Sequence, residues 1–513
     1  MTEQTHGFIE LFAAKAKRCP ENVFARFGER AIRFSEIMRD ASTLAAHLRQ
    51  LGIGQGGRVA VMMDNSPASI VVVHALALAG IVWVPVNIRQ RGAGLAYVLE
   101  HCSPAAILCD EAFLPVIHEA GANVDRTCLI VTGDMAVTDA RSGALSLRTL
   151  LSQPLDFDTA LPSGNDLFAI MYTSGTTGRP KGVLVTHAMM RLAGEAVALV
   201  TNARAGDILF MWEPLFHIGG AQVLVLPALM DVSLTMVDRF SATRFWQQVR
   251  TSGATHVHYL GGVLQILLKQ PPSATDREHA VRIFWGGGCK QDIWRQFEDR
   301  FGVEIRECYG MTEASSITTL NDSGTIGSVG RPLPWFSVEV CDGAGSTVPA
   351  GEKGEIVIRS NRDGAIFKGY YLDPVATSKA LRGGRFHTGD MGALNADGNL
   401  RFHGRLTDSV RVRGENVSAW EVEHVAASHP SIEDCAMIGV DADVGEQDIK
   451  LFVKLKPGQR LELPAFANWL AARLASFQMP RYFALVSEFQ RTPSERIMKH
   501  TLCQNAENDW ALS

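Results

Sequence analysis

The chain has 513 residues and a formal net charge of −5 at pH 7, with 46% hydrophobic and 20% charged residues. This composition is that of a soluble globular protein, and the length is too great for one core, so we expect two or more domains. The lack of a basic bias argues against nucleic acid or an anionic membrane surface as a partner.

The sequence carries no signal for secretion or membrane insertion. Residues 1–7 are polar and lack the basic and apolar parts of a signal peptide. The most apolar stretch, residues 68–86, contains His74, Gly80 and Pro85, so we interpret it as a buried helix and strand instead of a membrane span. Nine cysteines without Cys-x-x-Cys spacing predict reduced thiols in a cytoplasmic protein, with no structural zinc.

Helix and strand patterns alternate from the start of the chain. They predict, in order, a strand at 59–63, a helix at 68–79, a strand at 81–84, a helix at 95–101 and a strand at 105–109. This alternation is typical of α/β folds with largely parallel sheets, in which ligands bind at the carboxyl ends of the strands.

A loop rich in glycine and hydroxyl side chains follows, at residues 172–182. Apolar segments at 167–171 and 183–185 flank it, so we predict strand, loop, strand. Glycines let the backbone approach an anion, and Arg179 or Lys181 adds positive charge, which indicates a polyphosphate ligand. The loop matches neither a Walker A motif nor the dinucleotide fingerprint, and an ordinary surface turn is the plainer alternative.

The pattern changes near residue 328. Short, partly alternating segments with glycine turns between them predict antiparallel sheet at 338–341, 355–359, 398–403 and 408–412. A helix, two strands and a second helix are then predicted at 421–429, 434–440, 449–455 and 464–475.

We therefore predict an α/β fold with two domains. The large N-terminal domain, residues 1–404, is expected to contain stacked α/β sheets and a small β-barrel-like part. The small C-terminal domain, residues 405–513, is expected to be a mobile α+β unit of ordinary domain size.

Several further motifs lie in a fixed order between Thr173 and Lys499. They are Pro214-Leu215-Phe216-His217, Trp285-Gly286-Gly287-Gly288, Tyr309-Gly310-Met311-Thr312-Glu313, Phe386-His387-Thr388-Gly389-Asp390, Gly404-Arg405, Gly414-Glu415 and residues 491–499. With the hydroxyl-rich loop, they resemble the adenylate-forming superfamily across most of the chain. The resemblance is strongest to the acyl-CoA synthetase branch and, within it, to carnitine/crotonobetaine-type CoA ligases.

The resemblance implies a role for each of these residues. It assigns phosphate contacts and catalysis to Thr176, Lys181, His217, Thr312, Glu313 and Arg496, with Glu313 and Thr176 holding Mg²⁺. It assigns the binding of nucleotide and coenzyme A to Thr173, Ser174, Gly175, Thr177, Gly178, Gly287, Gly288, Tyr309, Gly310, Asp390, Arg405, Gly414 and Glu415. It assigns the acyl pocket to His217, Tyr259, Gly261, Trp285, Gly286 and Met311.

Each motif taken alone has a plainer interpretation. The Tyr309 motif is a turn with one acid, the glycine run is a flexible turn, and Asp390 is a turn residue. A single histidine beside apolar residues, such as His217, is more often a core residue, and we assign structural roles to His256 and His258. The order of the motifs along the chain favours the functional interpretation.

The family reaction implies the activity. A carboxylate attacks the α-phosphorus of Mg-ATP to give acyl-AMP and pyrophosphate, the C-terminal domain rotates, and coenzyme A displaces AMP. We therefore expect an AMP-forming carboxylate–CoA ligase that uses ATP, Mg²⁺ and coenzyme A and acts on a small-molecule carboxylic acid; a homodimer is only a base-rate expectation.

Two alternatives to a CoA ligase stay open. One is a stand-alone adenylating enzyme that loads a separate carrier protein, because no built-in carrier domain is expected. The other is a nucleotide-binding homologue without catalysis.

Two positions depart from the family pattern. Arg496 stands where the family has its catalytic lysine; it keeps the charge but is bulkier and forked, and Lys499 is the fallback cation. Thr407 stands where many members have Asp or Lys at the hinge, so either Thr407 or Asp408 is the hinge residue. The acid also stays open, because the aromatic residues that could cage a trimethylammonium group could equally shorten the pocket: Trp212, Tyr259 and Trp285.

Overall fold

The computed structural model describes residues 7–121, 127–133, 144–173, 180–406, 409–412, 415–442, 447–474, 476–491, 497–505 and 509–512. The chain divides into two compact units. The first contains the residues up to 173, Pro180–Ser337 and Arg359–Leu381, and the second contains Val338–Ile358 and the described residues from Arg382 onward.

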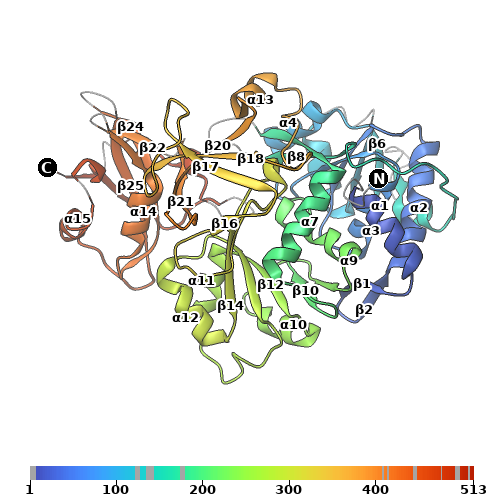
Figure 1. Cartoon of the computed structure of the whole chain (residues 1–513), viewed down its shortest axis with the longest axis horizontal. Helices are drawn as coiled ribbons and strands as arrows, with labels where there is room; N and C mark the ends of the chain where they lie inside the picture. The colour runs from blue at the N-terminus through green and yellow to red at the C-terminus, as the bar shows by residue number, and fades with distance from the viewer. Residues whose placement is uncertain are drawn as a thin grey trace. The chain divides into compact units, whose positions relative to one another are not determined.

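The first unit contains two large sheets, and the larger of them has nine strands (Figure 1). Its strands, in spatial order, are β16 (Arg331–Pro332), β15 (Thr319–Asn321), β14 (Glu304–Tyr309), β13 (Ile283–Gly287), β12 (His256–Leu260), β10 (Ile208–Met211), β11 (Ser233–Met236), β1 (Val23–Phe27) and β2 (Arg30–Arg33). The pairs from β14 to β1 are parallel, and the outer pairs are antiparallel.

A seven-stranded sheet forms the other half of the first unit. Its strands are β7 (Leu145–Ser146), β6 (Cys128–Val131), β5 (Ala106–Cys109), β3 (Arg58–Met62), β4 (Val82–Pro85), β8 (Leu167–Thr173) and β9 (Lys181–Thr186). All pairs are parallel except β8 with β9, whose antiparallel pairing confirms the predicted strands on either side of the hydroxyl-rich loop.

Helices cover these sheets in the first unit. They are α1 (Phe8–Arg18), α2 (Phe34–Gln50), α3 (Pro67–Leu78), α4 (Gly92–Cys102), α5 (Leu114–Glu119), α6 (Leu147–Leu151), α7 (His187–Thr201), α8 (Ile218–Ala221), α9 (Leu226–Leu229), α10 (Phe245–Ser252), α11 (Gly261–Lys269), α12 (Gln291–Phe301) and α13 (Pro374–Ala380). Helix α7 contacts β8 of one sheet and β13 and β14 of the other, so it packs between the two sheets. Figure 1 shows α10, α11 and α12 around β10, β12 and β14.

The most apolar segment of the sequence is a buried helix. The side chain of Ser66 accepts a hydrogen bond from Ser69 N and caps α3, and Pro67 stands in the first turn, where its missing N–H costs nothing. Every residue of α3 from Ser69 to Leu78 is buried, which explains its apolar character on all sides. None of the described helices combines the length and apolarity that a bilayer crossing requires.

The second unit begins with antiparallel strands, as predicted. Their sheet contains β17 (Phe336–Cys341), β18 (Lys353–Ser360), β20 (Arg385–Leu394), β19 (Leu381–Arg382) and β21 (Leu400–Arg405). We predicted a small β-barrel-like part in this region. The described strands form an open sheet and not a closed barrel. The motif Phe386–Asp390 lies within β20, where its backbone pairs with β18 and β21.

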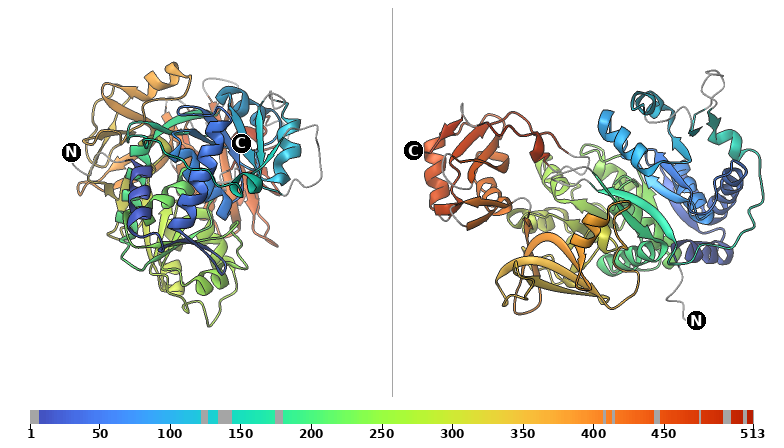
Figure 2. Two further views of the ribbon diagram at one scale, coloured as in Figure 1. Left: turned by 90° about the vertical axis from the view of Figure 1, so that its right-hand side faces the viewer. Right: turned by 90° about the horizontal axis from the view of Figure 1, so that it is seen from above.

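The C-terminal residues form an α+β arrangement, as predicted (Figure 2). A four-stranded sheet contains β24 (Ile432–Asp441), β25 (Gln447–Leu455), β26 (Tyr482–Leu485) and β27 (Trp510–Ala511), and a hairpin contains β22 (Ser409–Val412) and β23 (Glu415–Ser418). Helices α14 (Ala419–Ala427) and α15 (Leu463–Ala471) pack on the sheet through one apolar cluster. The predicted domain boundary at Arg405 marks where the C-terminal domain is expected to begin to move, and it stays a prediction.

Gly286 allows β12 and β13 to pair closely. A Cβ atom on Gly286 would lie 1.9 Å from the carbonyl oxygen of Tyr259, its partner in the ladder. We expect Gly286→Ala to lower the free energy of unfolding by about 1–3 kcal/mol, because the strands must separate. Gly94→Ala is the matched control, since a Cβ there meets nothing within 4 Å. Chemical unfolding of both variants measures this, and equal stability would contradict the argument.

Candidate active site

The predicted motifs of the first unit meet at one edge of the nine-stranded sheet. Glu213 lies just beyond β10, Gly287 ends β13 and Tyr309 ends β14, while Gly261 follows β12. These four strands are adjacent and parallel, so their carboxyl ends lie side by side. Such an edge is where ligands bind in α/β folds, and it unites motifs that are far apart in the sequence.

The turn after β14 is held in an uncommon conformation. Ser315 and Ser316 have φ angles of 49° and 72°, in the left-handed region that non-glycine residues seldom adopt. A Cβ on Gly310 would lie 1.9 Å from the carbonyl oxygen of Ser316, so only glycine fits where the turn closes. Thr312 and Glu313 are buried within it. Strained turns of this kind cluster at functional sites.

Tyr370 connects two residues that the sequence assigned to the phosphates. Its hydroxyl donates a hydrogen bond of 2.9 Å to Glu313 Oε1, and the Nζ of Lys181 lies 5.1 Å from the centre of its ring. Two backbone bonds fix the segment around Tyr370: Tyr371 N donates to the carbonyl of Gly182, and Phe367 N donates to the carbonyl of Glu313. A carboxylate and a cation therefore meet at one aromatic ring.

This arrangement suits a magnesium–polyphosphate ligand. Mg²⁺ in proteins is commonly bound by one or two carboxylates together with substrate phosphates, and Glu313 supplies one such carboxylate. Lys181 supplies positive charge nearby for the phosphates. The donor set therefore fits the implied metal.

Glu307 fixes the glycine run at the end of β13. Its carboxylate accepts hydrogen bonds from Gly288 N at 2.5 Å and from Cys289 N at 3.1 Å, and from the hydroxyl of Tyr259. Burial raises the pKa of Glu307 to about 7 despite these bonds. Burial also raises the pKa of the Cys289 thiol, with Glu307 adding to the effect, so this cysteine is not a thiolate nucleophile.

A narrow cavity lies between β10, β12, β13 and the start of α8. Its lining includes Trp212, Glu213, Gly219, Gly220, His258 and Trp285. His217 stands at the N-cap of α8, and its ring lies 4.6 Å from that of Phe216. We predicted a role in the acyl pocket for Trp285, and its side chain does line this cavity. Tyr259, which we assigned to the acyl pocket, belongs to an apolar cluster on the sheet, and its place in that pocket stays a prediction.

Asp390 and Arg405, which are predicted to bind the nucleotide, lie in the second unit. The two residues face each other across β20 and β21, and Arg405 Nε lies 3.5 Å from Asp390 Oδ1. Asp390 is 5% exposed, and its backbone N donates to Thr388 Oγ1. The pairing of the strands therefore sets the pair's position.

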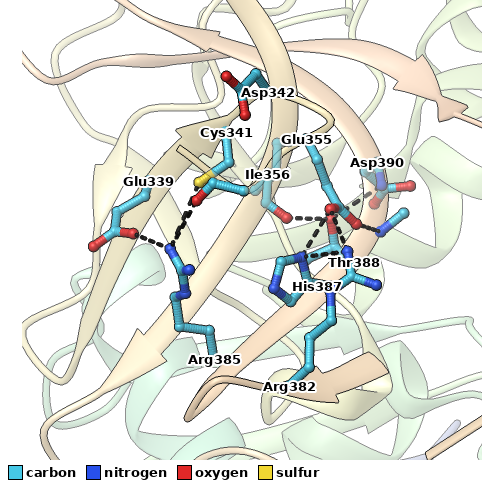
Figure 3. A network of polar contacts seen from close by, with 12 residues as sticks. Glu339, Cys341, Asp342, Glu355, Ile356, Arg382, Arg385, His387, Thr388 and Asp390 are labelled. Carbon is cyan, nitrogen blue, oxygen red and sulfur yellow. Dashed lines mark hydrogen bonds and ion pairs between the residues drawn. The ribbon is translucent and has the colours of Figure 1, made fainter. Parts of the chain in front are cut away.

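Glu355 of β18 fixes the segment of β20 that carries Asp390 (Figure 3). One of its oxygens accepts from Gly389 N at 3.1 Å, and the other lies 2.8 Å from His387 Nδ1 and 3.3 Å from Arg382 Nη2. His387 is thus a scaffold residue in this network, because its Nδ1 lies within hydrogen-bonding distance of the Glu355 carboxylate.

Some predicted site residues lie outside the described residues. They are Ser174, Gly175, Thr176, Thr177, Gly178, Gly414 and Arg496, as well as the hinge positions Thr407 and Asp408. The side chain of Glu415 is likewise not described. Thr173 is described, and it pairs with Lys181 across β8 and β9.

Sequence reasoning missed Tyr370, Glu307 and Glu213, and it assigned His258 a structural role. One signal was available for Glu307: in β14 it alternates with Ile305 and Tyr309 on the buried face, where an acid is unexpected. No local signal marks Tyr370, because its partners Glu313 and Lys181 are remote in the sequence.

Comparisons with known proteins agree with this geometry. Residues 12–371 match the family model described as AMP-binding enzyme, and residues 421–496 match that of the AMP-binding enzyme C-terminal domain. The chain is 32% identical, over 92% of its own length and 93% of the relative's, to a crotonobetaine/carnitine–CoA ligase of Salmonella agona (strain SL483). The same identity and coverage hold for that enzyme of Salmonella typhi.

Solved structures share the fold. The ATP-bound MatB of Rhodopseudomonas palustris superposes with a TM-score of 0.86 at 26% identity, covering 96% of this chain and 97% of that one. The anthranilate CoA ligase AuaEII with anthranoyl-AMP superposes with a TM-score of 0.87 at 23% identity, covering 97% and 96%.

The raised pKa of Glu307 predicts a pH-dependent stability. Between about pH 5 and pH 7 the folded chain holds a proton that the unfolded chain has released, so stability falls as pH rises through this window. The free energy of unfolding is expected to fall by an amount on the order of 1–3 kcal/mol across this window, and this fall should be absent in Glu307→Gln. Urea unfolding at pH 5, 6, 7 and 8 measures it. The control is Glu304→Gln, because Glu304 is exposed on the same strand. If the free energy of unfolding changed with pH in the same way in the wild type and in Glu307→Gln, the proposed role of Glu307 in the pH dependence would be refuted.

Proposed function

The chain belongs to the AMP-binding enzyme family and is an AMP-forming acyl-CoA ligase, and we propose that the strand-end site of its first unit binds the nucleotide and the acid. The enzyme joins a carboxylic acid to coenzyme A in two steps. The carboxylate attacks the α-phosphorus of ATP to give acyl-AMP and pyrophosphate; the thiol of coenzyme A then attacks the acyl carbon, and AMP leaves. ATP, Mg²⁺ and coenzyme A are its cofactors.

The contact of Tyr370 with both Glu313 and Lys181 is the observation that carries this proposal. In the first step two anions must approach each other, so the site has to spread negative charge over fixed cations and donors. Bound Mg²⁺ would supply Lewis acidity and charge neutralisation at the phosphates. Glu313 would hold that metal, Lys181 would bind phosphate, and Thr312 would donate to the α-phosphate.

The glycine run and the residues around it would form the walls for adenine and the acyl group. Gly287 and Gly288 would leave room for a planar ring, Gly286 would keep the wall close to β12, and Tyr309 would stack near the ring. Glu307 would act through this run as a positioning residue, because it bonds the backbone of Gly288. His217 and Met311 complete the proposed acid site.

In the second unit Asp390 and Arg405 would bind the ribose hydroxyls. A buried carboxylate that accepts from two hydroxyls is the means by which other nucleotide-binding folds hold ribose. Glu355 supports this role, since it accepts from the backbone N–H of Gly389, the residue before Asp390. Gly414 and Glu415 are proposed to line the path of coenzyme A.

We propose that the phosphate loop and the hinge act as in the family. Residues 173–178 would surround the phosphates, with Thr176 on Mg²⁺, and residues 405–513 would rotate about Thr407 or Asp408 between the steps. A cytoplasmic location and a homodimer are also proposed. Nine free cysteines support a reducing compartment, and base rates alone support the dimer.

We propose a small acid as the substrate. The cavity is narrow and is walled by Trp212 and Trp285, which favours a short acyl chain. Crotonobetaine and carnitine, named for the relatives, are the alternative class, and aromatic faces suit their trimethylammonium group.

Acid-dependent AMP release tests the function. Purified protein with Mg-ATP is given a panel of short-chain, aromatic and betaine acids, with and without coenzyme A. AMP release that requires coenzyme A and one class of acid supports the ligase. Pyrophosphate release that coenzyme A does not turn into AMP release favours a carrier-loading enzyme. ATP binding with no acid-dependent pyrophosphate favours a non-catalytic homologue.

Tyr370→Phe is expected to lower kcat/KM for adenylation about 10–100-fold and to raise the Mg²⁺ concentration needed for half-maximal rate. The reason is that the variant removes the hydrogen bond that orients Glu313. Glu313→Gln is expected to be more severe. Tyr371→Phe makes the same change one residue away and should behave as wild type. Magnesium titrations of pyrophosphate release measure this; an unchanged magnesium requirement in Tyr370→Phe would remove Tyr370 from the site.

Arg496→Ala is expected to lower adenylation at least about tenfold, because the proposed cation between carboxylate and phosphate is lost. Arg496→Lys should retain most of the rate. Pyrophosphate release from both variants is the measurement. Full activity in Arg496→Ala would transfer the role to another cation such as Lys499.

A further inference from the structure

A carboxylate and an imidazole lie together in the wall of the narrow cavity. Glu213 follows β10 and His258 lies in β12, the adjacent parallel strand. Glu213 Oε2 lies 2.6 Å from His258 Nδ1, and the two side chains are 7% and 11% exposed. Both residues line the cavity, so an entering ligand meets this pair.

The backbone around Glu213 is shaped to hold its carboxylate. A Cβ on Gly219 would lie 2.6 Å from each carboxylate oxygen, so any larger residue at the start of α8 would displace the acid. Asn65 bonds the same segment twice, donating to the carbonyl of Glu213 at 3.0 Å and accepting from Leu215 N at 3.1 Å. The carboxylate therefore has a fixed position, as a specificity group requires.

The partner imidazole is fixed as well. Trp212 Nε1 donates to the carbonyl of His258 at 2.7 Å, and the ring of Trp285 lies 4.3 Å from the His258 ring. The tryptophans thus support the polar pair and also form apolar walls of the cavity.

The rest of the lining contrasts with this pair. Apart from Glu213 and His258, the described residues that line the cavity have apolar, aromatic or no side chains: Leu209, Phe210, Met211, Trp212, Gly219, Gly220, Val223 and Trp285. No described lysine or arginine lines it. A few fixed polar groups in an otherwise apolar pocket are what orient and select a ligand.

The chemistry of the pair defines what it would select. A carboxylate is an acceptor of hydrogen bonds, so it favours a ligand that brings an N–H or O–H group. It disfavours a second anion, since like charges repel strongly in an apolar setting. The cavity has room for about one water molecule, which suits a hydroxyl or a primary ammonium group. A trimethylammonium group is broader and has no N–H to donate.

We propose that Glu213, supported by His258, selects a carboxylic acid whose far end donates a hydrogen bond, through a hydroxyl or a primary ammonium group. This inference rests on the proposed function, in which the cavity belongs to the acid site. A trimethylammonium acid, the class named for the 32% identical relatives, has no such donor.

Acids of matched length test the inference. Straight-chain acids of several lengths, each ending in methyl, hydroxyl, ammonium, trimethylammonium or carboxylate, are compared by kcat/KM for acid-dependent pyrophosphate release. The wild type is expected to prefer the hydroxyl or ammonium acid over the methyl acid at least about tenfold, because a site built for a hydrogen bond discriminates against a ligand that lacks it. The dicarboxylic acid should be the poorest substrate.

Two variants of Glu213 identify the donor. Glu213→Met removes the acceptor and should abolish the preference, lowering kcat/KM for both donor acids at least about tenfold relative to the methyl acid. Glu213→Gln removes only the charge, so it should reduce the preference for ammonium far more than that for hydroxyl. Glu195→Gln is the matched control. Glu195 lies on α7, pairs with Arg362 and does not line the cavity. Unchanged ATP binding by each variant confirms folding.

The failures are distinguishable. A wild type that prefers methyl or trimethylammonium acids overturns the inference and leaves the proposed function in place. So does a Glu213→Met variant in which all acids lose activity equally, because Glu213 would then be only structural. If none of the acids, in this set or in the wider panel, causes the wild type to release pyrophosphate, the proposed function itself is overturned.

Discussion

The parallel alignment of β10, β12, β13 and β14 is the constraint on which the candidate site depends. Parallel strands end at the same edge, so four motifs separated by long stretches of sequence are delivered to one place. The alignment needs close strand contact at Gly286, where a side chain would meet the carbonyl of Tyr259. It also leaves three acids at the edge, each of which must find a partner in a largely apolar setting.

These three acids have different partners, and their partners separate their roles. Glu313 accepts from Tyr370 near Lys181, which is an arrangement for metal and phosphate. Glu307 bonds the backbone of the glycine run, which makes it a positioning group. Glu213 meets an imidazole in a cavity wall, which suits selection of a ligand. One edge of one sheet thus holds the groups that we propose for metal binding, for positioning of the backbone and for selection of the acid.

The second unit applies the same logic with an antiparallel sheet. There the side chains of Asp390 and Arg405 lie close together across a strand pair, and Glu355 fixes the backbone just before Asp390 by accepting from Gly389 N. In each unit, therefore, a glutamate that is not proposed to react fixes the backbone of a segment that is proposed to contact the nucleotide. Glu307 does so at Gly288 and Glu355 at Gly389. Such supporting acids are as necessary as the contact residues, because a site that is slightly loose loses much of its rate.

The sequence by itself determined the elements, the family resemblance and the motif residues, because these depend on local pattern. Periodicity predicted β3, α3, β4 and the β8–β9 hairpin, and glycine-rich motifs marked the strand ends. Only the tertiary structure decided which side chains meet. Tyr370 bonds a residue 57 positions away and Tyr259 one that is 48 positions away. The Glu213–His258 pair likewise joins two strands whose order in the sheet no local pattern encodes.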